Sequence, residues 1–268
     1  MAWQRWCAAT LLALLATASW GHDSWLTPSR SVPPAGRQLL QLTTGNRYPV
    51  PEFSQSRESV VAARCSDGLV DLPLQPWRDQ PQWLELAALA ADGRPPLGCW
   101  LELAAVDVEI EPATVQLYFD EIRLAPQLRQ AWAAQLARGV RWRERYRKFA
   151  RVELPAAAQA APERLRQARQ PAGLGLELVV LGDQPVAARR RTEFQLLRDG
   201  KPLAGLPVEL VSQRSAFGLW GRTDDQGRVG WVLPFGGQWL LRGTELLPSG
   251  ERPDTWDSRF VTLVVEAS

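Results

Sequence analysis

The sequence predicts a mainly β protein, built from two β-sandwich domains that are joined by a short helical segment. Short runs of strand-forming residues alternate with Gly, Pro and Asp turns near both ends of the chain, and the stretch between them has helical apolar spacing. We expect residues 1–21 to be a signal peptide, 22–112 the first sandwich, 113–173 the helical segment and linker, and 174–268 the second sandwich.

Residues 1–21 are typical of a signal peptide that is removed during export. Arg5 carries the single charge of this segment, and the apolar run 8–15 that follows is shorter than the roughly 20 residues that span a bilayer. No later segment is apolar over such a length. We therefore expect a periplasmic protein that is soluble once the signal has been cleaved.

The cleavage point has two candidates. Ser19 and Gly21 provide the small residues that favour cleavage before His22. Ala16 and Ala18 allow cleavage before Ser19, which leaves almost no polar segment behind the apolar run. The first position is therefore favoured, and the mature protein is expected to begin with histidine.

The first sandwich is predicted from three strand-like runs. Residues 39–43 and 60–62 are rich in strand formers, and 106–110 alternates between apolar and polar residues as a strand with one wet face does. Cys65 and Cys99 are the two cysteines left after cleavage. In an oxidising compartment such a pair is read more simply as a disulfide than as a metal or redox site.

The middle segment is predicted to be helical. Residues 117–122 and 128–136 have helix-like spacing, and Gly139 is a plausible end. In 141–149 aromatic residues recur at i, i+4 and i+7 among cations, which predicts an amphipathic helix packed on a sandwich. A linker is expected at 156–173.

The same basic, aromatic stretch has a second interpretation. Trp142, Arg145 and Tyr146 would form an exposed face that binds anionic lipid or polysaccharide. Packing of the helix on a sandwich is the favoured alternative.

The last hundred residues predict an immunoglobulin-like or prealbumin-like sandwich. Asp199-Gly200 is a strong turn signal between strand-like runs. The expected strands include 194–197, 208–211, 229–233, 237–241 and 260–265.

Composition excludes several classes of function. The formal net charge of +2 falls to +1 when Arg5 leaves with the signal, which argues against nucleic acid as a partner. The chain has one histidine, so a site built from several histidines is impossible and a Ser-His-Asp triad would have to use His22. We expect a protein that is not an enzyme.

The mature N-terminus carries the sharpest functional signal. A free α-amine and the Nδ1 atom of His22 can chelate one transition-metal ion, with an acid such as Asp23 or Glu245 completing the site. The alternative is that His22 is simply the first residue of a strand. A rival function is that of a cell-envelope module that binds a glycan or another protein through its aromatic residues.

Several short motifs, in order, resemble one known family. They are Gly21-His22-Asp23-Ser24-Trp25-Leu26, Arg143-Glu144-Arg145-Tyr146, Thr223-Asp224-Asp225-Gln226-Gly227-Arg228, Gly237-Gln238-Trp239-Leu240 and Trp256-Asp257-Ser258. Together they resemble a periplasmic family of unknown function that is often labelled a nickel- or cobalt-uptake accessory component (NikK-like). This resemblance implies a periplasmic protein that handles a metal and works with an uptake transporter, with His22 as the candidate ligand. The function we expect first is therefore that of a non-enzymatic protein that captures or passes nickel, cobalt or copper.

Overall fold

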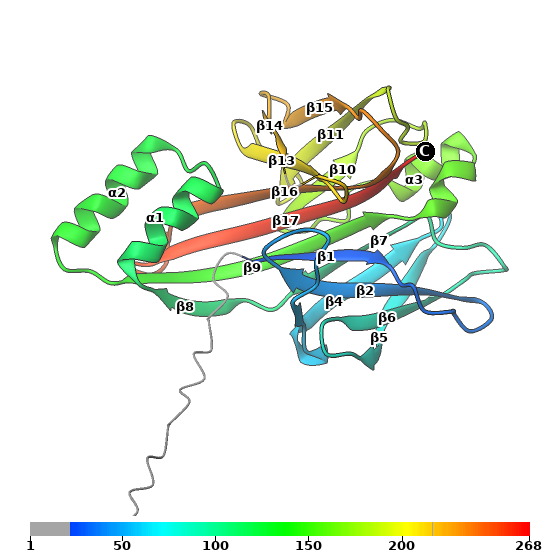
Figure 1. Cartoon of the computed structure of the whole chain (residues 1–268), viewed down its shortest axis with the longest axis horizontal. Coiled ribbons are helices and arrows are strands. Elements are labelled where there is room, and N and C mark those ends of the chain that lie inside the picture. Colours follow the sequence, from blue (N-terminus) through cyan, green and yellow to red (C-terminus); the bar gives the residue numbers. More distant parts are fainter. Residues whose placement is uncertain (1–21, 216) are drawn as a thin grey trace, which may run out of the picture.

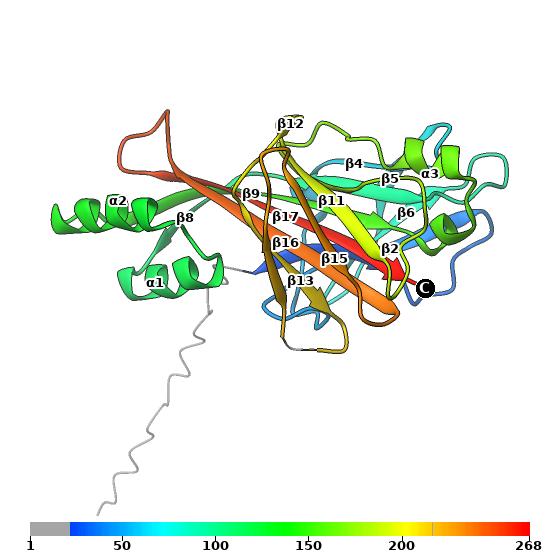
Figure 2. The same ribbon diagram turned by 90° about the horizontal axis from the view of Figure 1, so that it is seen from above.

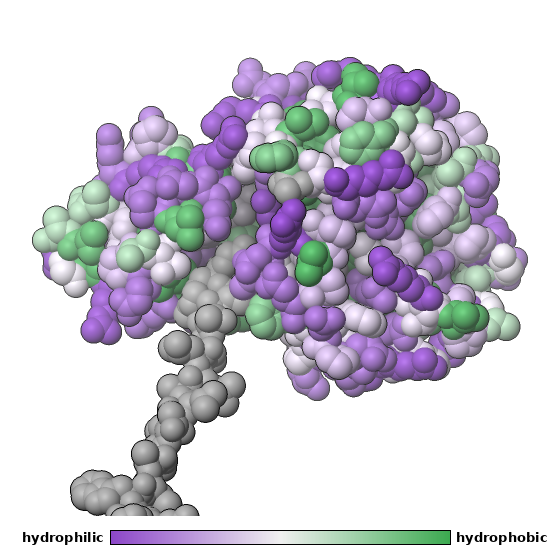
Figure 3. All heavy atoms as spheres, viewed as in Figure 1, coloured by the Kyte–Doolittle hydropathy of each residue, from purple (hydrophilic) through white to green (hydrophobic). Residues whose placement is uncertain are grey.

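The computed structural model describes residues 22–215 and 217–268, and the predicted signal peptide lies outside these residues. The protein is mainly β, as predicted (Figure 1). No helix in the described part of the chain is long and apolar enough to cross a membrane. The face drawn in Figure 3 carries mainly hydrophilic side chains, and the apolar ones are scattered over it.

The strands of the first half are β1 (Asp23–Pro28), β2 (Arg37–Gly45), β3 (Phe53–Ser54), β4 (Val60–Ser66), β5 (Asp71–Asp79), β6 (Leu84–Leu89), β7 (Gly98–Leu103) and β8 (Val106–Ile110). Those of the second half are β9 (Trp142–Glu153), β10 (Leu176–Val180), β11 (Arg191–Arg198), β12 (Lys201–Pro202), β13 (Pro207–Ser212), β14 (Leu219–Arg222), β15 (Arg228–Val232), β16 (Gly237–Pro248) and β17 (Trp256–Ala267). The helices are α1 (Pro112–Glu121), α2 (Pro126–Ala137) and α3 (Pro162–Ala168), with 3-10 turns at Arg57–Ser59 and Pro155–Gln159.

One long sheet connects the two halves of the chain. Its strand order is β1-β2-β6-β5-β4-β7-β9-β17-β16-β13-β14, and β1 packs back over β9 and β17. A smaller sheet with the order β10-β11-β12, to which β15 adds on β11, covers the other face of β17. Figure 1 shows the long strands β9, β17 and β16 between the first-half strands and the smaller sheet, and Figure 2 shows them from above.

The two faces of β17 explain this layering. Val264 belongs to the core shared with the first-half strands, whereas Val261, Leu263 and Val265 belong to the core under the smaller sheet. Because alternate residues of a strand point to opposite faces, both faces of β17 are buried. Residues 260–265 of β17 are accordingly apolar except for Thr262.

The prediction of a helix at 141–149 is wrong, because these residues form most of β9. This strand pairs antiparallel with β7 and β8 and parallel with β17. Its burial alternates with a period of two over its first half: Trp142, Glu144 and Lys148 are buried, and the arginines between them are exposed. The helical spacing of the aromatic residues was coincidental, since hydrogen bonding on both sides decides the conformation.

The other two helices of the middle segment are confirmed. α1 and α2 lie at one end of the molecule, where they pack against the ends of β9, β16 and β17 (Figure 1). Gly139 follows α2 with a φ of 78°, a conformation that glycine adopts without strain. The expected linker 156–173 is not structureless, because it contains α3 and most of a 3-10 turn.

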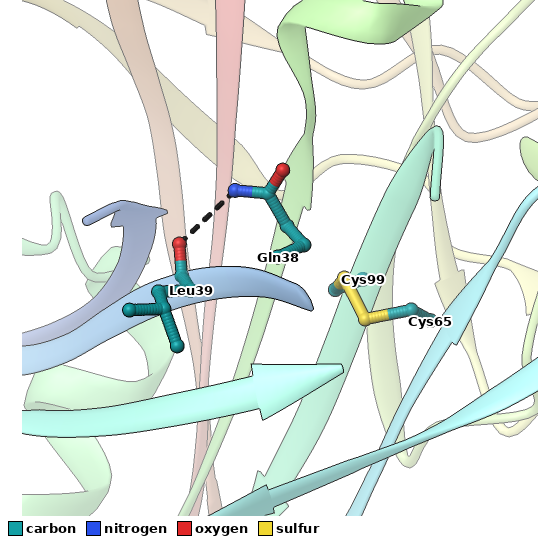
Figure 4. The surroundings of a disulfide bond; sticks show 4 residues. All are labelled: Gln38, Leu39, Cys65 and Cys99. Atoms are coloured by element: carbon teal, nitrogen blue, oxygen red, sulfur yellow. Dashed lines mark hydrogen bonds between the residues drawn. A yellow bond between two sulfur atoms is a disulfide. The ribbon is translucent and has the colours of Figure 1, made fainter. Parts of the chain in front are cut away.

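The disulfide between Cys65 and Cys99 is confirmed. The two residues face each other on β4 and β7, with their Cα atoms 3.9 Å apart and both side chains buried. Figure 4 shows the bond near Gln38 and Leu39 of β2, where the Gln38 amide donates to the Leu39 carbonyl. The bond therefore joins two neighbouring strands inside the core that the first-half strands form.

Candidate functional site

His22 directly precedes β1 and is anchored on the central strands. Lys148 Nζ donates to the His22 carbonyl oxygen at 2.6 Å, and Thr262 Oγ1 donates to the Ser24 carbonyl oxygen at 2.7 Å. These bonds reach from β9 and β17 to the start of β1. The position at which the mature chain is predicted to begin is therefore fixed against the centre of the molecule.

The side chain of His22 is 8% exposed, and its imidazole lies edge-on to Phe53, with ring centroids 5.4 Å apart. Its Nε2 atom is 3.3 Å from Glu52 Oε2. Within the described residues, neither ring nitrogen makes a hydrogen bond. Burial lowers the pKa of His22 although Glu52 opposes the shift, so the ring is neutral at neutral pH.

Glu52 is itself held in place. Its carboxylate accepts from the Asn46 backbone N–H at 3.2 Å and from the Asn46 side-chain amide at 3.3 Å. A carboxylate beside Nε2 favours the tautomer with its proton on that atom, which leaves the Nδ1 lone pair free. This is the nitrogen that a chelate with the α-amine requires.

Asp23 forms an ion-pair network next to His22. Arg242 Nη1 lies 2.6 Å from Asp23 Oδ2, and its Nε donates to Glu209 Oε2 at 2.6 Å. Burial opposes the charge of Arg242, but the two carboxylates outweigh it and raise the pKa of Arg242. One of the two Asp23 oxygens is therefore engaged by the protein.

A second buried network lies beneath Lys148. Glu144 accepts from Tyr118 Oη at 3.1 Å, from Trp142 Nε1 at 3.0 Å and from Ser258 Oγ. Burial raises the pKa of Glu144, and it lowers the pKa of Lys148 to about 8 although Asp23 and Glu144 oppose that shift. These groups stiffen the strands that support His22.

An open cleft of about 370 Å³, here called the β1 cleft, lies beside Asp23. α1 and the segment that follows it form one wall, and β13, β14, β16 and β17 contribute the other. At its rim the Arg123 guanidinium stacks over the Trp220 ring, 4.2 Å from the ring centroid. The lining residues are Asp23, Asn46, Leu117, Glu121, Ile122, Pro207, Trp220, Arg242, Gly243, Thr244 and Phe260.

The structure does not bring Glu245 to His22. Glu245 is three residues from Arg242 on β16, so the two side chains point to opposite faces of the strand, and Glu245 lies 3.4 Å from Arg198 at the end of β11. In the described part of the chain, no three His, Cys, Asp or Glu side chains form a group that could hold a metal. A metal at His22 would therefore need the free α-amine.

The three residues of the predicted aromatic and basic face are not brought together either. Trp142 is fully buried and stacks on Trp256, with ring centroids 4.9 Å apart. Tyr146 is half-buried on the same side of β9, whereas Arg145 is exposed on the other side. Alternation along the strand separates them.

Sequence reasoning missed Glu52, Lys148 and Arg242. A period of two in 142–148 would have put Lys148 on the face of Trp142 and Glu144. Glu52 lies between β2 and β3 outside any periodic segment, so the sequence contains no signal for its contact with His22.

The sequence matches the family described as a domain of unknown function (DUF4198) over residues 19–244, and the chain belongs to this family. The predicted resemblance to a family of unknown function is thus confirmed at this level. No curated protein matches the chain.

One solved structure, described as a tetra-tandem repeat in the extending region of a large adhesion protein, is similar to 92% of this chain at 8% identity. The match covers 49% of that protein's chain, with a TM-score of 0.22. A TM-score at this level supports no conclusion about the present chain.

Proposed function

We propose that this chain is an exported metal-binding accessory protein of the periplasm, whose mature form begins at His22. Its cargo is one nickel, cobalt or copper ion, held by the α-amine and by Nδ1 of His22. Asp23 Oδ1 is the oxygen that we assign as a further ligand. The protein passes this ion to an uptake transporter of the cell envelope.

The observation that carries this proposal is the state of the His22 ring. A buried imidazole normally finds hydrogen-bond partners, because an unpaired buried polar atom costs free energy. Here both ring nitrogens lack a hydrogen bond among the described residues. An imidazole kept neutral by burial and left with a free nitrogen is suited to bind a metal.

The position of Glu52 supports the same assignment. Metal-binding histidines commonly donate their second ring N–H to a carboxylate, which orients the ring and makes the metal-bound nitrogen more basic. Glu52 Oε2 lies 3.3 Å from Nε2 and is steadied by Asn46. In the metal-bound protein that we propose, Nε2–H would donate to this carboxylate, as in a carboxylate–histidine–metal triad.

The proposed donor set determines the choice of ion and the pH dependence. Nitrogen donors favour nickel, cobalt and copper, whereas magnesium and calcium prefer oxygen. The α-amine has a pKa near 8, so affinity should climb between about pH 6 and about pH 8. The lowered pKa of His22 leaves the amine as the group that sets this range.

Calorimetric titration of the metal-free mature protein with nickel tests the proposal. His22→Ala removes Nδ1, and one extra residue before His22 converts the amine into an amide. Both changes should weaken binding sharply, while calcium should bind to none of the three proteins. Equal nickel binding by all three proteins, or no binding by the mature form, would contradict the proposal.

A further inference from the structure

Three arginines of β9 form a row on an exposed face of the protein. Arg143, Arg145 and Arg147 alternate with buried or half-buried residues, and all three side chains are exposed. Because every second side chain of a strand points to the same face, neighbouring arginines of this row are about 6.6 Å apart along the strand. We call these three residues the β9 arginine row. Further along the same face, Phe149 lies in the core under the smaller sheet, so the row occupies the part of the face that this sheet leaves open.

The carboxylates beside the middle of the row are held by another side chain. Arg145 is paired in register with Asp107 of β8 on one side and with Asp257 of β17 on the other. Arg252 binds both of these carboxylates, at 2.6 Å and 3.0 Å. Among the residues that the structure describes, no carboxylate forms an ion pair with a guanidinium group of the row. The charges of the row are therefore available to a partner.

The row is only one strand wide. At one end Arg147 lies opposite Arg259 of β17, which forms an ion pair with Asp199. At the other end Arg143 lies opposite Glu109 of β8. Neighbouring strands are about 4.8 Å apart, so a flat layer of anionic lipid headgroups would meet the acids of β8 and β17 as well as the arginines. A linear anion can follow the row along β9, so the arrangement of charges favours a linear partner.

A cavity of about 590 Å³ lies at the Arg143 end of the row. Arg143, Asp107 and Glu109 belong to its lining, and it shares no lining residue with the β1 cleft. Guanidinium groups bind anions through two parallel N–H donors, and carboxylates accept hydrogen bonds from hydroxyl groups. The combination suits a ligand that carries both anionic groups and hydroxyls, as the sugars of an acidic polysaccharide do.

We propose that the β9 arginine row binds a linear anionic polysaccharide. The guanidinium groups of the row pair with successive anionic groups of the polymer, and Glu109 accepts hydrogen bonds from its hydroxyls. This surface differs from the aromatic and basic face predicted from the sequence, because Trp142 and Tyr146 point to the other side of β9. It contains no residue of the His22 site, so it does not depend on the metal function.

Calorimetric titration of the mature protein with tetragalacturonate tests the proposal. This oligosaccharide is linear and carries one carboxylate on each sugar. It should bind in the millimolar range or tighter, and added salt should weaken binding, because salt screens exposed charges. Its fully methyl-esterified form has the same chain without the charges and should not bind. The triple variant Arg143→Gln/Arg145→Gln/Arg147→Gln should weaken binding of tetragalacturonate at least tenfold.

The matched control is the triple variant Arg189→Gln/Arg190→Gln/Arg228→Gln. These arginines are also exposed and lie outside β9, so both triple variants lose the same charge. The control should keep the affinity of the unaltered protein. Urea unfolding checks that both triple variants are folded. Arg145→Gln alone removes one exposed charge and should still weaken binding about twofold or more, which keeps the test valid if the triple variant of the row does not fold.

Three results would overturn the proposal. The first is that tetragalacturonate does not bind, and the second is that the two triple variants weaken its binding equally. The third is that tetraglutamate, or vesicles that contain anionic lipid, bind as tightly as tetragalacturonate and lose affinity with the same substitutions. The row would then bind an acidic polypeptide or a membrane surface in place of a polysaccharide.

Discussion

The lone histidine of the chain lies between an aromatic ring and a carboxylate. Phe53 limits the movement of the His22 ring, and Glu52 faces its Nε2 atom. Both neighbours belong to the segment that follows β2. The surroundings of His22 therefore come from two parts of the first sandwich, the start of β1 and this segment. We therefore expect Glu52 to orient the ring.

This role predicts the effect of Glu52→Gln. The substitution keeps the shape of the side chain but removes the charge that favours a proton on Nε2. Loss of such an orienting group typically weakens metal affinity about 10- to 100-fold. Calorimetric titration with nickel should show this loss, whereas Glu251→Gln, at an exposed position, should bind as the unaltered protein does. Unchanged affinity of Glu52→Gln would exclude the orienting role.

The lowered pKa of Lys148 leads to a second prediction, which concerns the stability of the metal-free protein. Its pKa is about 8 in the folded protein against 10.5 for the free side chain. Between these values the unfolded chain still binds the proton that the folded protein has released, so raising the pH favours folding. The contribution from pH 8 to pH 10 is on the order of 2 kcal/mol.

Urea unfolding at both pH values measures this contribution. Lys148→Met should lack it, so the stability difference between the variant and the unaltered protein should change with pH. Lys201→Met is the matched control, because Lys201 is exposed and is the other lysine of the chain. If both variants follow the pH dependence of the unaltered protein, Lys148 does not have the lowered pKa.

Part of the His22 site could be predicted from the sequence. The small residues before His22 drew attention to it, and Asp23 follows it directly. Lys148 and Arg242 approach them because β1 packs over the central strands, which brings together residues more than a hundred positions apart and leaves no local pattern in the sequence. The prediction of Glu245 as a metal ligand failed for the same reason. Which side of β16 faces His22 depends on the segments that pack against the strand, and Glu245 lies on the other side.

At the level of elements, β9 shows why periodicity failed in one place. Its aromatic residues fit a helical spacing. Its arginines fit the solvent-exposed face of a helix as well as that of a strand. Predictions at 106–110 and 260–265 succeeded because apolar residues alternate or run continuously there without a helical alternative. Charged residues at buried positions, such as Glu144 and Lys148, obscured the alternation of β9.

The strand assignment of β9 predicts unequal effects of two nearby substitutions. Trp142→Ala empties a buried position between Trp132 and Trp256 and should cost about 3–5 kcal/mol of stability. Arg145→Ala changes an exposed side chain and should cost less than about 0.5 kcal/mol. Urea unfolding of both variants checks the difference. Similar losses in the two variants would contradict this arrangement.

At the level of the whole molecule, the two sandwiches share their central strands. Most individual strands were predictable, but the parallel pairing of β9 with β17 joins residues near 144 to residues near 256. Local sequence determines which segments are extended, whereas the choice of partner depends on burial across the whole chain. The start of β1 consequently rests on the central strands β9 and β17, which suits the fixed metal-binding terminus that we propose.

We propose that the exported chain begins at His22 and binds one transition-metal ion there. Native mass spectrometry of the protein recovered from the periplasm and mixed with one equivalent of nickel measures both properties together. We expect the mass of residues 22–268 plus one nickel ion, and no bound nickel in the His22→Ala variant. A chain that begins at Ser19, or a chain that begins at His22 and stays metal-free, would contradict it.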